Sequence, residues 1–294
     1  MPVVLRCDDM TVSGSSGGRV AFVLGGGGVH GASEVGMLRA LSEAGIVPDV
    51  IVGTSVGAIN GAMFARDPDE AGVRVLGELW ERLAASEVFG ASLASQTATL
   101  VRTRTHVQRH GPLRRLLHEQ FGDTQIEELS VPFECVAASI ERAAEHWFRR
   151  GALVDAVLAS SAVPGLLPAV HIDGEHFLDG GLVASIPVDR AIALGAKTVY
   201  VLQVGRIESP LRPPRQPLEV ALVAFEIARR HRFATTMAGL PDDVDVHVLP
   251  TGAQPMALSD RRQFRYRDFG SVPMRIATAY GASREYLESL DLHP

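Results

Sequence analysis

Two glycine-rich turns near the N-terminus constrain the fold of this chain more than any other feature. The first is GGGGVHG over residues 25–31, and the second is GTSVG over residues 53–57. Each follows a short apolar run of strand length, at 19–24 and 49–53, and each precedes a helical pattern. A continuous apolar run is typical of a strand buried on both faces, as in a parallel sheet covered by helices. The two turns therefore predict consecutive strand–helix units.

The same alternation continues along the chain. Further strands are predicted at 133–139, 146–148, 198–204 and 245–249, with a hairpin over 171–179 that turns at Asp173-Gly174. Helices are predicted at 32–44, 56–65, 69–84, 152–162, 187–194, 218–237 and about 271–289. Residues 85–130 show the least regular pattern, and 206–216 form a proline-rich loop. We therefore predict an α/β fold in one domain, with a mostly parallel central sheet covered on both sides.

Composition narrows the classes of function. The chain has 294 residues and a net charge of −6, which argues against a nucleic-acid partner. Its two cysteines, Cys7 and Cys135, make neither a disulfide framework nor a metal site, and they fit a reducing, cytoplasmic setting. No run approaches the roughly 18–20 apolar residues of a membrane-spanning helix. The start of the chain, residues 1–18, is rich in Ser and Gly and resembles a disordered leader.

The second turn offers a nucleophile. Ser55 stands between Gly53 and Gly57 on a predicted strand-to-helix bend, where glycines relieve crowding and expose the hydroxyl. A serine hydroxyl is a weak nucleophile until a base removes its proton. The turn therefore predicts a serine hydrolase, provided that a base lies nearby.

The first turn has two readings. Gly26, Gly28 and Gly31 match the dinucleotide-binding fingerprint after a strand. That fingerprint requires an acid at the end of the second strand, but Asp49 stands at its beginning. We therefore favour an oxyanion hole made by the N–H groups of Gly26, Gly27 and Gly28.

The residues alone leave the base open. His247 would complete a serine–aspartate–histidine order along the chain, although it lies in an alternating strand pattern where a structural role is more common. Asp179 ends an apolar strand and is followed by Gly180 and Gly181, which holds its carboxylate at a turn. A third hypothesis is a lipid- or nucleotide-binding module that uses the same loops without turnover.

The chain resembles the patatin-like phospholipases, in particular the bacterial branch related to neuropathy target esterase. The resemblance covers about 20 to 204 and rests on GGGGVHG, GTSVG and DGG (179–181), in that order. The stretches ASSAVPGLLP (159–168) and GGLVASIPV (180–188) support it. It implies a three-layer α/β/α patatin-like fold, with a catalytic core over 19–204 and a C-terminal extension over 205–294 packed on the same domain.

The resemblance also implies a mechanism. Ser55 would be the nucleophile, Asp179 the base without any histidine, and Gly26, Gly27 and Gly28 the oxyanion hole. Substrates would be phospholipid or lysophospholipid esters, and no metal or other cofactor is implied. The residues that would support the three motifs are Gly25, His30, Gly31, Gly53, Gly57, Gly180 and Gly181.

Two further features bear on this function. The family usually carries arginine at the position of His30, so we hypothesise that His30 packs on the loop and makes activity more sensitive to pH. An arginine-rich, acid-free stretch could bring the protein to an anionic membrane surface as a peripheral contact. Its members are Arg102, Arg104, Arg109, Arg114 and Arg115.

Overall fold

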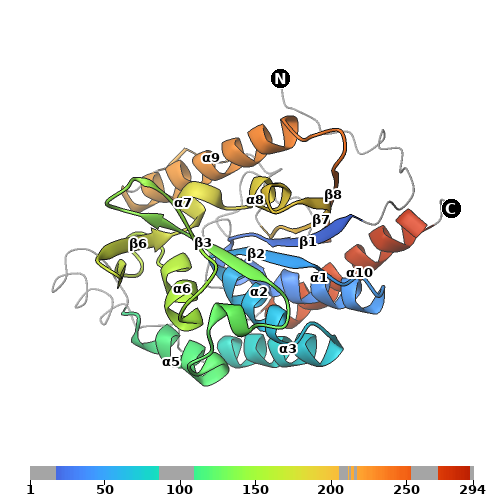
Figure 1. Ribbon diagram of the computed structural model, residues 1–294, viewed down its shortest axis with the longest axis horizontal. Helices are drawn as coiled ribbons and strands as arrows, with labels where there is room; N and C mark the ends of the chain where they lie inside the picture. Colours follow the sequence, from blue (N-terminus) through green and yellow to red (C-terminus); the bar gives the residue numbers. More distant parts are fainter. Residues whose placement is uncertain are drawn as a thin grey trace.

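The computed structural model describes residues 18–85, 109–204, 211, 213–214, 217–252 and 271–291. These residues build one eight-stranded sheet, with the order β5-β6-β3-β2-β1-β7-β8 and with β4 paired to β3 (Figure 1). The strands are β1 (Arg19–Leu24), β2 (Val50–Thr54), β3 (Phe133–Ser139), β4 (Ala144–Phe148), β5 (Val170–Ile172), β6 (Glu175–Asp179), β7 (Ala196–Leu202) and β8 (Asp245–Val248). The pairs among β3, β2, β1, β7 and β8 are parallel, whereas β4, β5 and β6 pair antiparallel.

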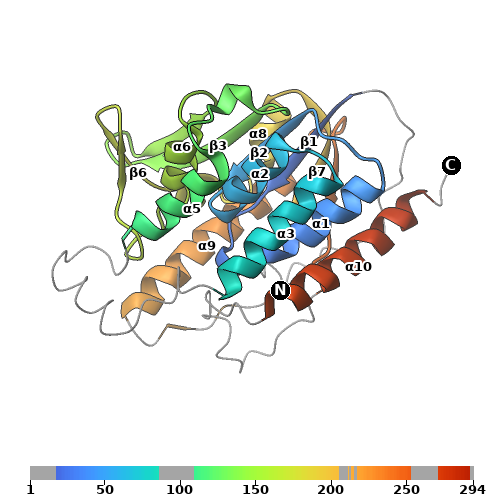
Figure 2. The same cartoon turned by 90° about the horizontal axis from the view of Figure 1, so that it is seen from below.

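Helices cover both faces of the sheet. One face carries α7, α8 and α9, and the other carries α1, α2, α3 and α10, with α5 and α6 beside them (Figures 1 and 2). The α-helices are α1 (Ala32–Glu43), α2 (Val56–Arg66), α3 (Glu70–Ala85), α5 (Gly111–Phe121), α6 (Leu153–Ser160), α7 (Gly181–Ala184), α8 (Val188–Ala193), α9 (Pro217–Ala238) and α10 (Val272–Asp291). Two short 3-10 helices are η1 (Gly28–Gly31) and η2 (Ile126–Glu128). The predicted α/β fold with a mostly parallel, doubly covered sheet is confirmed.

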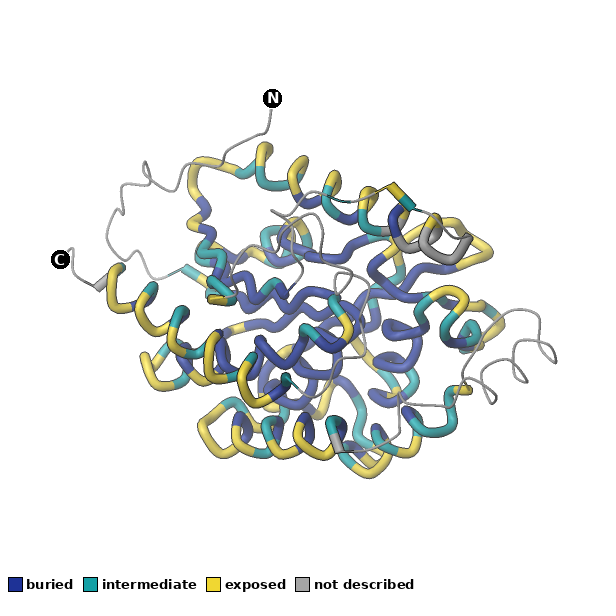
Figure 3. Tube along the Cα trace, turned by 180° about the vertical axis from the view of Figure 1, so that it is seen from behind, coloured by how far each residue is buried: buried dark blue, intermediate teal, exposed yellow. Residues whose placement is uncertain are grey.

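The apolar runs are buried because each strand serves two cores. Along β1, Ala21 and Val23 pack into the cluster on the α8 and α9 side, whereas Phe22 and Leu24 pack into the larger cluster on the other side. Successive side chains of a strand point to opposite faces, so both sets must be apolar. Figure 3 shows the resulting pattern, with buried central strands and exposed outer helix faces.

The expectation that 85–130 is irregular was wrong for α5. Leu113, Leu117 and Phe121 are buried at a spacing of four residues, and a proline stands in the first turn of this helix. The arginine-rich composition hid this apolar stripe. The predicted hairpin at 171–179 is confirmed, with positive φ at Asp173 (49°) and Gly174 (84°).

Two elements of the C-terminal segment, β8 and α10, pack on the sheet and helices formed by the preceding residues. β8 pairs with β7, and α10 lies along α1 (Figure 2). A Cβ at Gly36 of α1 would come within 2.2 Å of the Ile276 carbonyl oxygen, so the two helices approach closely there. Tyr280 Oη also donates a hydrogen bond to Glu43 Oε2 at 2.6 Å.

Several predictions lie outside the described residues, namely those for the leader through residue 17, Cys7, Arg102 and Arg104. Within the described part of the chain, no helix combines the length and the apolar character needed to cross a bilayer.

Candidate active site

The register of β3 brings the ends of β2 and β6 together. Thr54, the last residue of β2, pairs with Val136, and Asp179, the last residue of β6, pairs with Ala137. Because β4 pairs along the other edge of β3, β2 and β6 must share one edge. The two strands therefore meet end to end, and Ser55 follows directly after this junction.

Ser55 and Asp179 are in direct contact. Ser55 Oγ donates a hydrogen bond to Asp179 Oδ2 at 2.6 Å, and Gly181 N–H donates to Asp179 Oδ1 at 2.7 Å. The two site residues are 8% and 1% exposed. Each carboxylate oxygen thus has one donor, which fixes the plane of the carboxylate toward the serine hydroxyl.

Burial makes the Asp179 carboxyl harder to ionise than an exposed aspartate. Desolvation raises the pKa of Asp179 to about 6, while the hydrogen bonds from Ser55 and Gly181 lower it in part. A general base works best with a pKa near the operating pH. At neutral pH this carboxylate is ionised, yet it is more basic than an exposed aspartate.

Ser55 occupies a strained backbone conformation. Its φ and ψ are 55° and −122°, a region that side-chain-bearing residues rarely adopt. The flanking glycines make the bend possible: a Cβ at Gly53 would lie 2.6 Å from the Gly57 carbonyl oxygen, and a Cβ at Gly57 would lie 2.3 Å from that of Leu24. The predicted strand-to-helix turn around Ser55 is therefore present, and it projects the hydroxyl from the end of β2.

The C-terminal end of α6 holds both members of the pair. Ser160 Oγ accepts a hydrogen bond from Ser55 N–H at 2.9 Å, and Ser161 Oγ donates to the Ser55 carbonyl at 3.2 Å. The Ala162 carbonyl accepts from Asp179 N–H at 2.9 Å. No sequence pattern predicted a role for these two serines, although they lie in the ASSAVPGLLP stretch that supported the resemblance.

The glycine-rich loop lies against Ser55. A Cβ at Gly26 would be 3.4 Å from Ser55 Cβ, so the loop backbone approaches the serine closely. Gly26 N–H donates to the Ser185 carbonyl at 3.0 Å and is therefore already engaged. Gly27 and Gly28 stand at the start of η1, where N–H groups have no intrahelical acceptor. Gly26 N–H therefore already has an acceptor, and Gly27 and Gly28 stay predicted oxyanion donors.

A buried polar network centred on Asn60 of α2 supports the glycine-rich loop. Asn60 Nδ2 donates to the Gly31 carbonyl at 2.9 Å and to Glu34 Oε2 at 2.7 Å, and Asn60 Oδ1 accepts from Trp80 Nε1 at 3.0 Å. Burial raises the pKa of Glu34 well above its usual range. Gly31 also allows close packing, since a Cβ there would lie 2.5 Å from Val56 Cγ2.

Two further motif residues have clear local roles. His30 lies on η1, and its Nδ1 is 2.8 Å from Arg275 Nη1 of α10, so a guanidinium from another part of the chain reaches this position. A Cβ at Gly180 would lie 2.2 Å from the Val136 carbonyl oxygen, which requires glycine beside β3.

His247 lies apart from the serine. It is on β8, which β7 and β1 separate from β2, and it stacks on Tyr200 with its Nδ1 3.2 Å from Tyr286 Oη. Burial lowers the pKa of His247. Within the described residues no histidine contacts Ser55 or Asp179, which argues against a histidine-containing triad.

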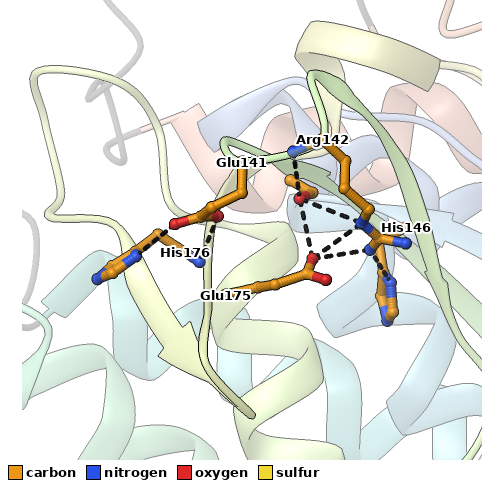
Figure 4. A network of polar contacts seen from close by, with 6 residues as sticks. Glu141, Arg142, His146, Glu175 and His176 are labelled. Carbon is orange, nitrogen blue, oxygen red and sulfur yellow. Dashed lines mark hydrogen bonds and ion pairs between the residues drawn. The ribbon is translucent and has the colours of Figure 1, made fainter.

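His176 of the hairpin belongs to a surface polar network and does not contact Ser55 or Asp179. His176 binds Glu141 through both its backbone N–H (2.9 Å) and its Nδ1 (2.7 Å), while Arg142 contacts Glu175 and His146 (Figure 4). The hydrogen bonds from His176 lower the pKa of Glu141 to about 2.

Among the described residues, no group of three or more His, Cys, Asp or Glu side chains is arranged to hold a metal ion. Cys135 is a free, buried thiol on β3, and burial raises its pKa. It behaves as a small apolar residue of the core.

Comparison with known proteins identifies the chain's relatives. The family described as Patatin-like phospholipase matches residues 22–192, which contain the three motifs. Lysophospholipase nte1 of Aspergillus terreus is 34% identical over 200 residues, covering 65% of this chain and 12% of the relative. Human patatin-like phospholipase domain-containing protein 6 is 33% identical over 192 residues, covering 65% of this chain and 14% of the relative.

The chain thus spans only a small part of the length of these curated relatives. Among solved structures, VipD from Legionella pneumophila aligns with a TM-score of 0.46 at 14% identity, over 94% of this chain and 67% of that one. The family match covers more than half of the chain and agrees with the resemblance inferred from the motifs. The chain belongs to the patatin-like phospholipase family.

Proposed function

We propose that this protein is a serine acyl hydrolase that cleaves carboxylic ester bonds of phospholipids or lysophospholipids. The observation that carries the proposal is the 2.6 Å hydrogen bond from Ser55 Oγ to the buried carboxylate of Asp179. Two relatives, a lysophospholipase and a patatin-like phospholipase, support the substrate class.

The first half of the reaction forms an acyl-enzyme. Ser55 Oγ attacks the ester carbonyl carbon while Asp179 Oδ2 takes the hydroxyl proton. The carbonyl oxygen becomes an oxyanion, which the N–H groups of Gly27 and Gly28 stabilise. When the tetrahedral intermediate collapses, the alcohol leaves with the proton held by Asp179, and the acyl group stays on Ser55.

The second half releases the fatty acid. A water molecule attacks the acyl carbon, and Asp179 takes its proton. The same oxyanion donors stabilise the second intermediate. Collapse returns the proton to Ser55 Oγ and frees the carboxylic acid. Asp179 serves both halves because Gly181 N–H, at 2.7 Å from Oδ1, keeps the carboxylate aimed at the serine.

A hydrolysis panel tests the proposal. Wild type is assayed on phosphatidylcholine, lysophosphatidylcholine and a short-chain nitrophenyl ester, beside Ser55→Ala, Asp179→Asn and His247→Ala. We expect wild type and His247→Ala to release acid, and the other two variants to lose at least about 10³-fold in kcat. Activity near the wild-type level in Ser55→Ala would contradict the proposal.

Covalent labelling separates an enzyme from a binding module. A fluorophosphonate probe should modify Ser55 in wild type and leave Ser55→Ala unmodified, because only an activated serine attacks the phosphorus. Lipid binding by wild type without labelling or hydrolysis would favour the non-catalytic module. Loss of hydrolysis in His247→Ala would instead favour a triad.

We further propose that the protein acts in the cytoplasm and meets anionic membranes peripherally. Arg109 and Arg115 are exposed near and on α5, whereas Arg114 is paired with Asp155 at 2.8 Å. Sedimentation with vesicles of phosphatidylcholine, with and without phosphatidylglycerol, tests this contact. Binding should depend on the anionic lipid and weaken in a double Arg109→Ala, Arg115→Ala variant, and equal binding to both vesicles would contradict it.

A further inference from the structure

We propose that Arg229 of α9 is a positioning residue, which polarises and orients the peptide group that supplies the Gly27 oxyanion donor. This inference rests on the proposed hydrolase function and extends it to a helix outside the family-matched segment of residues 22–192. It assigns to α9 a part in the reaction that none of the three motifs contains.

The contact is direct and buried. Arg229 Nη1 donates a hydrogen bond to the Gly26 carbonyl at 3.1 Å, across 203 residues of sequence. Arg229 Nη2 is 3.3 Å from Glu226 Oε2, one turn earlier on α9. The Arg229 side chain is 3% exposed and that of Glu226 is 13% exposed. The guanidinium of Arg229 thus extends from α9 to the backbone of the glycine-rich loop.

Folding stability alone gives a poor account of this arginine. Burying a charged side chain is unfavourable unless its donors are satisfied, and here Nε is buried without a partner among the described residues. Its ion pair with Glu226 is long at 3.3 Å. A well-packed apolar side chain at this place in α9 would avoid that unfavourable burial, so the contact with the loop is the feature that distinguishes arginine here.

The chemistry follows from the connectivity of the peptide. The Gly26 carbonyl and the Gly27 N–H belong to one planar amide group. A positively charged donor on the carbonyl oxygen draws electron density toward it and makes the N–H a stronger donor, as in cooperative hydrogen-bond chains. The Gly27 N–H then binds a developing oxyanion more strongly than an ordinary amide does.

Orientation adds to polarisation. Gly26 N–H is held by the Ser185 carbonyl at 3.0 Å, and the Gly26 carbonyl is held by Arg229. These two bonds fix the peptide groups on both sides of Gly26 before substrate arrives. Preorganised donors need no rearrangement when the oxyanion forms, which is the main advantage of such a site. The positive charge also favours the movement of negative charge from Asp179 to the oxyanion during attack.

The test compares Arg229→Ala and Arg229→Lys with Arg230→Ala. Arg230 is the matched control, because its Nε is also 3.3 Å from Glu226 Oε2 on the same helix. On a short-chain nitrophenyl ester, we expect Arg229→Ala to lose at least about tenfold in kcat with KM within about twofold. Arg229→Lys should be intermediate, and Arg230→Ala should stay within about twofold of wild type. Millimolar guanidinium should raise kcat in Arg229→Ala only.

The outcomes separate this inference from the proposed function. An inactive wild type would overturn the hydrolase itself. An active wild type with a folded Arg229→Ala of unchanged kcat would overturn only the role of Arg229, as would equal losses in Arg229→Ala and Arg230→Ala. If Arg229→Ala does not fold, Arg229→Lys becomes the deciding variant. A reduced kcat at unchanged KM in Arg229→Lys would support the positioning role of Arg229. A wild-type kcat in this variant, or its failure to fold, would overturn that role.

Discussion

Replacing Asp179 with asparagine should abolish activity and stabilise the fold. Asp179 is 1% exposed, and burial raises the pKa of its carboxyl from 3.8 to about 6. One pKa unit corresponds to about 1.4 kcal/mol, so holding the carboxylate charged in the folded state at pH 8 costs roughly 3 kcal/mol. Asparagine has nearly the same shape and carries no charge. Its oxygen can accept from Gly181 N–H, and its amide can donate to Ser55 Oγ.

The sign of the pH dependence is fixed by the direction of this shift. Because the folded-state pKa lies above the unfolded value, the folded protein binds more protons between pH 3.8 and about 6, and wild-type stability falls as pH rises through that window. The gain from Asp179→Asn should therefore be close to zero near pH 4, and it should reach roughly 3 kcal/mol by pH 8. In the same window, wild-type kcat/KM should rise as the base loses its proton.

Denaturant unfolding of wild type and Asp179→Asn at several pH values from 4 to 8 measures this difference. Asp173→Asn is the control, because that aspartate is exposed in the turn of the same hairpin, and we expect a change within about 0.5 kcal/mol. A difference between Asp179→Asn and wild type that stays constant with pH would refute the raised pKa. A large loss of stability at pH 8 would show that the carboxylate is structural.

Three other substitutions probe the supports of the site. Gly57→Ala should lower the free energy of unfolding in urea by roughly 2 kcal/mol or more, because the new Cβ would lie 2.3 Å from a carbonyl oxygen of β1. Gly77→Ala is the control: its Cβ would have its nearest neighbour at 3.9 Å, so this substitution should stabilise α3. Asn60→Ala should cost roughly 2–4 kcal/mol by the same assay, since the Gly31 carbonyl, Glu34 and Trp80 each lose one buried hydrogen bond. A cost under about 1 kcal/mol would contradict this. His30→Arg should lower Tm at low salt and recover at high salt, because it sets a second guanidinium beside Arg275, and a salt-independent Tm would count against that repulsion.

Much of the fold could be predicted from local sequence. The turns at 25–31 and 53–57, the hairpin at Asp173-Gly174 and most strands and helices follow from periodicity and turn residues, which act over a few neighbouring positions. One exception was α5, where arginines between Leu113 and Phe121 obscured an apolar stripe that only tertiary packing makes evident. The short helices α7 and η2 were not predicted either. Helical pattern is weak evidence where charged residues dominate the window.

The candidate site divides in the same way. The residue types and their order predicted Ser55 and the glycine-rich loop, since a serine between glycines and a run of glycines after a strand are local patterns. They left Asp179 and His247 as alternative bases, and only the family resemblance favoured Asp179. The sequence did not identify Ser160 and Ser161, which hold the Ser55 backbone through single hydrogen bonds and have no pattern of their own. Nor did it show that Gly26 N–H is already bonded to Ser185.

The sequence by itself determined that the chain forms strand–helix units carrying a serine turn and a glycine-rich loop. The tertiary structure decided which residues meet: Asp179 rather than His247 reaches Ser55, across 124 residues, and Arg229 reaches Gly26 across 203. The physical reason is that turn chemistry and side-chain periodicity act locally. Contacts of such separation depend instead on strand order and register, here on β2 and β6 meeting along one edge of β3.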